Sequence, residues 1–247
     1  MILLIIMKTT SEKILLIVGY NMDYHEVKQL KLIINATVQG LYRISKEQNI
    51  SISENDKNFY IFLIKHVIFF DYILNSYPET FILKVLISDF SYLIMNDMKQ
   101  NDRYIKLHER SIIENYLRLI LKNPDYIRNI DTNAFNELKD SCNTYNLNDK
   151  QVGAVHSAYK LSCSYIHGGK ILEENLPKFF SEVFTNIHKT KKNKNIQNNR
   201  IIQYISYLDL AFITSNKEVV SNSFHRRKSM LDVLISKEKA RILFTQQ

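Results

Sequence analysis

The sequence predicts an all-α protein, a bundle of helices with a helical extension at its C-terminal end. Its 247 residues include only five glycines and three prolines, too few for the many chain reversals of a β-rich or doubly wound fold. Apolar residues recur at helical spacing along most of the chain, and no credible pair of strands is visible. With 45% hydrophobic residues, the chain can bury a substantial core, so extensive disorder is not expected.

Short connectors with helix-stopping or helix-starting residues separate the periodic segments. The connector "NSYPE" precedes the third segment, "KNPD" follows the fourth and "NLND" precedes the sixth. In the sixth, Asn148 and Gln151 have the spacing of a capping box, and Gly168 suits the left-handed residue that ends a helix. The expected helices cover residues 24–48, 58–77, 79–98, 102–122, 133–145, 149–167, 173–189, 199–214 and 217–244.

One shift in composition divides the chain, at the polar stretch "KTKKNKNIQNN". We take this stretch as the boundary between a main bundle, residues 1–190, and a basic extension, residues 191–247. The extension is amphipathic, because Ile201, Ile205, Leu208 and Phe212 recur at helical spacing. We therefore expect it to pack on the bundle or on a second copy of the chain.

Nearly all of the basic excess lies in the C-terminal part. Residues 181–247 hold twelve Lys and Arg against five Asp and Glu, a net charge of +7 out of +8 for the whole chain. One interpretation is an electrostatic footprint for RNA or another polyanion, and the other is a solvated linker and helix face. The residues that would contact RNA are Lys191, Lys192 and Lys194 in "HKTKKNKN", and Arg226 and Arg227 in "HRRK".

The chain carries no convincing targeting or membrane segment. Its opening "MILLIIMKTTSEKILLIV" has two apolar runs too short for a bilayer span, and its positive charge follows the first run, whereas a signal peptide places it before. Met1 and Met7 are both candidate start residues. Two cysteines, Cys142 and Cys163, form neither a disulfide framework nor a metal-ligand pattern, which fits a reducing compartment. We expect a cytoplasmic protein without membrane contact.

A charged stripe runs along the expected helix 102–122. In "HERSIIENYLRLILK", Arg110, Glu114 and Arg118 recur every four residues, so Glu114 can bridge both arginines. The stripe borders the apolar face, where charges are often partly buried and paired. The alternative is a surface ladder worth a few tenths of a kcal/mol per pair.

A second polar stripe lies on the expected helix 149–167, which is otherwise largely apolar. At about 100° per residue, His156, Lys160, Cys163, Ser164 and His167 share one narrow sector. Such a stripe must face water, a partner or a polar pocket, since unpaired buried polar groups cost about 1–3 kcal/mol each. His167 at a helix C-terminus also has a purely structural explanation in the helix dipole. The two histidines are about 16 Å apart along the axis, too far to bind one metal ion, so no metal or other cofactor is expected.

Together, "RSIIENYLR" on one helix and "AYKLSCSYIHGG" closing a later one resemble motifs of the HEPN superfamily, in particular the HEPN-like proteins of bacterial abortive-infection and other anti-phage systems. The resemblance covers roughly residues 58–189 and implies an up-and-down helical bundle that forms a homodimer. Active members of that family are metal-independent endoribonucleases. In them the ribose 2′-hydroxyl attacks the adjacent phosphate, a histidine acts as general acid or base, and an arginine stabilises the phosphate charge.

Carried over to this chain, the resemblance assigns the family histidine to His167 and its tail to Gly168 and Gly169. The family hallmark is an arginine, then four to six residues, then the histidine, and this arginine is absent here. In that stretch only Lys160 is cationic, and it shares a helix face with His167, so it is the candidate cation, although it lacks the guanidinium fork. The resemblance gives Arg110, Glu114 and Arg118 the role of lining or bracing the same pocket.

Three functions are consistent with these patterns. The first is a defence-associated ribonuclease toxin with His167 and Lys160 at its centre. The second is a catalytically inert HEPN-like module that dimerises and binds RNA or a partner protein, an alternative favoured by the absent arginine. The third is a helical adaptor of a larger defence complex, in which the last two helices form the docking surface.

Overall fold

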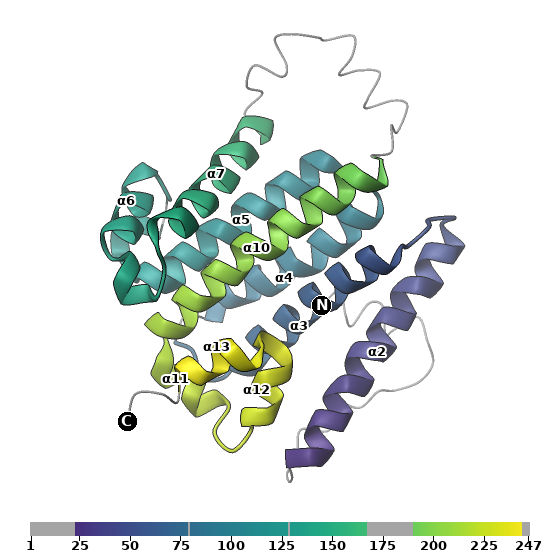
Figure 1. Ribbon diagram of the computed structural model, residues 1–247, viewed down its shortest axis with the longest axis horizontal. Helices are drawn as coiled ribbons and strands as arrows, with labels where there is room; N and C mark the ends of the chain where they lie inside the picture. The colour runs from purple at the N-terminus through teal and green to yellow at the C-terminus, as the bar shows by residue number, and fades with distance from the viewer. Residues whose placement is uncertain (1–22, 79, 128, 167–189, 244–247) are drawn as a thin grey trace. The chain divides into compact units, whose positions relative to one another are not determined.

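A computed structural model describes residues 23–78, 80–127, 129–166 and 190–243, and the chain is helical throughout most of these ranges (Figure 1). The described residues contain no strand, which confirms the all-α prediction. None of the helices in these ranges is both long and apolar enough to cross a bilayer. The expected helix 173–189 and the opening apolar runs lie outside the described residues.

The chain folds into two compact units that do not follow the expected boundary at residue 190. The first unit combines residues 1–91 with residues 216–247, and the second consists of residues 92–215. Helix α4, Thr80–Met98, contributes residues to both units.

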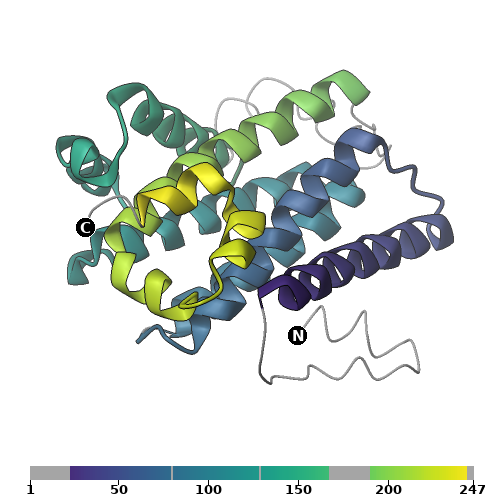
Figure 2. The ribbon, with the colours of Figure 1, turned by 60° about the horizontal axis from the view of Figure 1, so that its bottom comes forward.

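In the first unit, helices from the two ends of the sequence pack together. Helices α2, Asp23–Glu47, and α3, Glu54–Leu74, pack on each other, and α12, Lys228–Ile235, packs on both (Figure 2). Ser53 caps α3 in a reciprocal capping box with Asp56. Phe224, which is 1% exposed, stacks on Phe69 and brings the end of the chain into this core. The C-terminal residues therefore complete the unit that α2 begins.

The expected helix 217–244 is wrong in one respect, because this stretch forms three short helices. They are α11, Lys217–Ser223, α12, and α13, Lys237–Ile242. The chain takes left-handed backbone angles at Arg226, with φ 63°, and at Ser236, with φ 84°, and an α-helix cannot continue through such residues. Between the two breaks, Leu231 and Leu234 of α12 are buried, so tertiary packing overrides local helical periodicity here.

The second unit is built around α5, Asp102–Leu121. Helix α5 packs on α6, Thr132–Asp140, on α7, Asp149–Ile166, and on α10, Lys191–Ser215 (Figure 1). Short 3₁₀ turns, Pro124–Tyr126 and Cys142–Tyr145, flank α6. The expected capping box of α7 is confirmed, because Asn148 and Gln151 exchange side chain to backbone hydrogen bonds of 2.9 and 3.1 Å. A buried hydrogen bond of 2.7 Å from the Tyr116 hydroxyl to Asp209 joins α5 to α10.

Helix α10 begins eight residues before the expected helix 199–214. The polar stretch that we took as a domain boundary is its first two turns, and several of its polar side chains are buried. Lys194, 8% exposed, pairs with Asp97 of α4 at 3.1 Å. A polar sequence therefore enters the protein interior because an acidic partner lies there, which composition alone does not reveal.

Candidate functional site

The charged stripe of α5 forms the bridged ion-pair ladder that its spacing predicted. Arg110 Nε donates to Glu114 Oε1 at 2.7 Å, and Arg118 Nη2 lies 3.5 Å from Glu114 Oε2. All three side chains are between 15% and 23% exposed. The ladder is therefore partly buried, and its pairs are screened less by solvent than those of a surface ladder.

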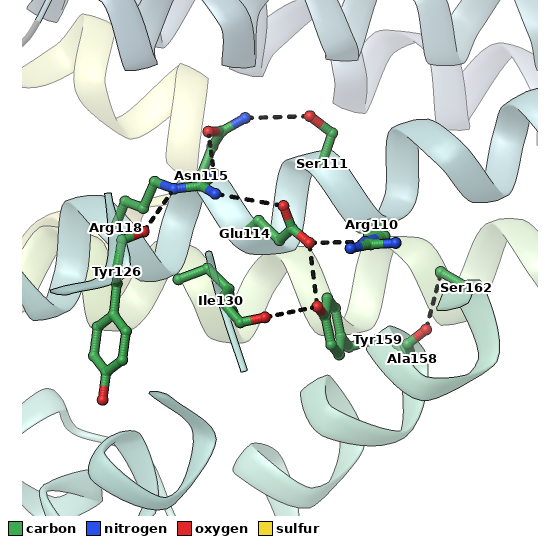
Figure 3. Close-up of polar contacts among 10 residues, drawn as sticks. All are labelled: Arg110, Ser111, Glu114, Asn115, Arg118, Tyr126, Ile130, Ala158, Tyr159 and Ser162. Atoms are coloured by element: carbon green, nitrogen blue, oxygen red, sulfur yellow. Dashed lines mark hydrogen bonds and ion pairs between the residues drawn. The ribbon is translucent and has the colours of Figure 1, made fainter. Parts of the chain in front are cut away.

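Tyr159 of α7 joins this ladder to the helix that carries the second stripe (Figure 3). Its hydroxyl lies 3.1 Å from Glu114 Oε1 and 3.0 Å from the Ile130 carbonyl oxygen. The Arg110 guanidinium lies 5.9 Å from the centroid of the Tyr159 ring. Burial and the neighbouring Glu114 carboxylate raise the pKa of Tyr159, so the hydroxyl stays protonated and can donate. The two motifs that carry the family resemblance are thus in direct contact.

Arg118 has a second, structural task at the other end of the ladder. Its Nε donates to the Tyr126 carbonyl oxygen at 3.0 Å, and its Nη1 donates to Asn115 at 3.0 Å (Figure 3). The Tyr126 hydroxyl in turn donates to Glu137 of α6 at 2.9 Å. These contacts fasten the turn between α5 and α6. Sequence analysis expected Arg118 to line or brace a pocket and did not foresee that the Tyr126 carbonyl oxygen would accept its hydrogen bond.

Lys160 lies on α7 with an exposed side chain, and it forms no hydrogen bond or ion pair within the described ranges. His156, one turn earlier, stacks on Phe135 of α6 with ring centroids 4.4 Å apart. Burial first, and the positive charge of Lys160 second, lower the pKa of His156. His167 and its glycine tail lie outside the described residues, so the spacing between Lys160 and His167 stays a prediction.

The basic residues expected to bind RNA are divided between the two units. Lys191 and Lys192 are exposed at the start of α10 in the second unit, whereas Arg226 and Arg227 belong to the first unit. Lys194 is 8% exposed and pairs with Asp97, and its contact with RNA stays a prediction. Arg227 pairs with Glu26 at 3.2 Å and lies over the Tyr72 ring, and Arg226 is exposed. Lys191, Lys192 and Arg226 remain available to solvent.

A buried ion cluster, which sequence analysis missed, links α5 to α10. Lys106 Nζ donates to Glu109 Oε1 at 2.7 Å, and Arg200 Nη2 lies 2.8 and 2.6 Å from the two Glu109 oxygens. Glu109 is fully buried and the Lys106 side chain is 5% exposed. The three-residue spacing of Lys106 and Glu109 indicates that they can pair on a helix. Arg200 is 91 residues from Glu109, and no pattern in the sequence indicates their contact.

Among the described residues, no group of three or more His, Cys, Asp or Glu side chains is arranged to hold a metal ion. The groups at the α5–α7 contact are the two arginines, the Glu114 carboxylate and the Tyr159 hydroxyl. Such groups bind and orient anions and transfer protons.

Comparison of the chain with protein-family models, with curated proteins and with solved structures finds no match.

Proposed function

We propose that this chain is an HEPN-like endoribonuclease that acts as a toxin in anti-phage defence, with its reactive groups at the end of α7 beside α5. One observation carries the proposal: the hydrogen bond of 3.1 Å between Tyr159 and Glu114 brings together the two motifs on which the resemblance depends. The contact supports the proposal because Tyr159 and Glu114 are 45 residues apart in the sequence and belong to different motifs. A homodimer, as in the family, is part of the proposal.

The proposed reaction needs three tasks from the chain. A base takes the proton of a ribose 2′-hydroxyl, whose oxygen attacks the adjacent phosphorus. A cation stabilises the added negative charge, and an acid returns a proton to the leaving 5′-oxygen, so that a 2′,3′-cyclic phosphate and a 5′-hydroxyl remain. We assign the proton transfers to His167 and the charge stabilisation to Lys160. Arg110, Glu114 and Tyr159 hold α7 in register on α5 and so orient both groups.

The test is inducible expression of the chain in bacteria, with the ends of total RNA sequenced. The intact chain should arrest growth and produce new 2′,3′-cyclic phosphate ends, and His167→Ala should abolish both. His225→Ala is the matched control, because His225 is exposed in the first unit. Full activity of a folded His167→Ala variant would overturn the proposed chemistry.

A second candidate function is an inert HEPN-like module that dimerises and binds RNA or a partner protein. It is favoured by the ion pair between Glu114 and Arg118 and by the hydrogen bond from Arg118 to the Tyr126 carbonyl oxygen, which engage both charges within the protein. On this reading RNA binding depends on the exposed cations. The double variant Lys191→Glu, Lys192→Glu should then flatten the dependence of RNA affinity on salt. Expression of the intact chain should neither slow bacterial growth nor cleave cellular RNA.

Both candidate functions require that the protein meet cellular RNA. Cys142 and Cys163 are free thiols, which fits a reducing environment. We expect the protein in the cytoplasm, and fractionation of cells that express it checks this.

A further inference from the structure

The buried ion cluster of Lys106, Glu109 and Arg200 has hydrogen-bonding capacity that the described residues do not use. Arg200 engages Glu109 through Nη2 alone. Its Nη1 is buried and has no hydrogen-bond partner in the structure. A guanidinium presents a fork of donors suited to two oxygens of one anion, so a second oxyanion can be accepted on the Nη1 side.

Tyr204, one turn after Arg200 on α10, adds a second unused donor. Its side chain is 1% exposed, and its buried hydroxyl has no hydrogen-bond partner in the structure. The Arg200 guanidinium lies 6.0 Å from the centroid of the Tyr204 ring. Burial, followed by the charge of Glu109, raises the pKa of Tyr204 well above its ordinary value, so the hydroxyl keeps its proton. A buried hydroxyl left unpaired costs about 1–3 kcal/mol, so an acceptor is expected there.

The cluster lies beside the last turn of α7. Lys106 Nζ is 5.7 Å from the centroid of the Tyr165 ring, and Tyr165 is two residues before His167. Helix α10 packs on both α5 and α7. Two cationic side chains, Lys106 and Arg200, contact the Glu109 carboxylate. The unused Nη1 donor of the Arg200 guanidinium fork favours an oxyanion as the occupant.

We infer that Arg200 and Tyr204, with Glu109 holding the guanidinium and Lys106 adding positive charge, form a binding site for a phosphate group. The ligand is either inorganic phosphate or a phosphodiester of RNA, because both offer the same oxygens. If it is RNA, the site supplies from α5 and α10 the cation that the α7 motif lacks, and this part of the inference rests on the proposed function. Ordered water is the other way to satisfy these donors.

The first experiment measures binding of inorganic phosphate by calorimetry, with chloride at matched ionic strength as the reference. The wild-type chain should bind phosphate, and Arg200→Gln and Tyr204→Phe should each weaken binding about tenfold or more. Tyr204→Phe removes only the unpaired hydroxyl, so its melting temperature should equal or exceed that of the wild type. This variant keeps the test valid if Arg200→Gln does not fold.

The matched control is Tyr207→Phe, since the Tyr207 hydroxyl is on the same helix and accepts a hydrogen bond from Gln203 at 3.0 Å. It should bind phosphate as the wild type does. Absence of phosphate binding by the wild type, or equal affinity in the wild type and Tyr204→Phe, would overturn the site and leave water as the occupant.

The second experiment separates the two sources of phosphate and the two proposals. A short single-stranded RNA should compete with inorganic phosphate if the site holds RNA, and should not compete if it holds free phosphate. His167→Ala should retain phosphate affinity while it loses RNA cleavage. Phosphate binding without any cleavage by the wild type would reject the proposed ribonuclease and leave the site standing, and cleavage without phosphate binding would reject the site alone.

Discussion

The ionisable side chains of α5 divide between two faces with different consequences. Arg110, Glu114 and Arg118 meet α7 and the following turn while they keep some solvent exposure. Glu109 pairs with Arg200 of α10 and with Lys106, and Lys106 and Glu109 are almost fully buried. Removal of one partner of a buried ion pair is costly because a charge stays behind without compensation, whereas exposed pairs contribute little.

Glu109→Gln should destabilise the protein by about 3 kcal/mol, because it leaves Lys106 and Arg200 without the carboxylate they share. Urea denaturation followed by circular dichroism measures the change. Glu54→Gln is the matched control, since Glu54 is 70% exposed and pairs with Lys57 at the start of α3, and its loss should cost less than about 1 kcal/mol. Similar losses for the two variants would contradict the burial of the cluster.

The charge of Lys160 can be detected through its neighbour His156. Burial and Lys160 both lower the pKa of His156, so Lys160→Gln should raise it, though not to its ordinary value, because burial remains. Two-dimensional NMR titration of the histidine rings measures this shift. Lys139→Gln, an exposed lysine on α6, should leave the pKa of His156 unchanged.

The lowered pKa of His156 also makes the stability of the protein depend on pH. A histidine whose pKa is lower in the folded state contributes stability that is present above its unfolded pKa and is lost as the pH falls through the folded pKa. Lys160→Gln should therefore reduce the acid-induced loss of stability in that window. An unchanged pKa in Lys160→Gln would show that the two side chains do not interact.

At the scale of elements, α10 shows how a polar stretch becomes helical through its partners. Lys191 and Lys192 occupy its first turn, where the helix dipole disfavours positive charge. Lys194 nevertheless reaches into the interior and pairs with Asp97, which is 1% exposed. The first turns of α10 therefore combine a local cap, in which the Thr190 hydroxyl accepts from the Asn193 amide at 3.3 Å, with a tertiary ion pair.

Lys194→Gln should destabilise the second unit by about 3 kcal/mol and fray the first turns of α10, because Asp97 would lose the ammonium group with which it pairs. Hydrogen exchange of the α10 amides measures the fraying. Lys192→Gln should change stability by less than about 0.5 kcal/mol, since Lys192 is exposed. If the two variants behave alike, Lys194 is a surface residue after all.

At the scale of the whole molecule, the chain divides into two compact units that do not follow the order of the sequence. Residues 216–247 close the unit that residues 1–91 begin, and residues 92–215 form the other unit without interruption. Cooperative unfolding units often coincide with such dense regions. We therefore expect a core mutation to act mainly within its own unit.

Leu231→Ala in α12 and Leu208→Ala in α10 form a reciprocal pair, since each removes a fully buried leucine from a different unit. Each should lower the opening free energy of its own unit by about 2–5 kcal/mol. Hydrogen exchange with peptide-level mass spectrometry reads both units at once. Equal loss of protection in α3 and α7 for either variant would show that the chain unfolds as a single cooperative body.

Local patterns were sufficient for much of this protein. The scarcity of glycine and proline and the helical periodicity determined the fold class and the approximate ranges of α2 to α5 and α7, because these features depend on near neighbours in the chain. The four-residue spacing of Arg110, Glu114 and Arg118 also determined the ladder, since side chains at that spacing meet on any helix.

Contacts between residues distant in sequence decided the rest. Tertiary structure set the link from Tyr159 to Glu114, the burial of Lys194, the pairing of Arg200 with Glu109 and the breaks at Arg226 and Ser236. Each depends on which helix faces which, and on the desolvation that this packing imposes on a charge. A sequence specifies such contacts only through the complete fold, so they cannot be read from local spacing.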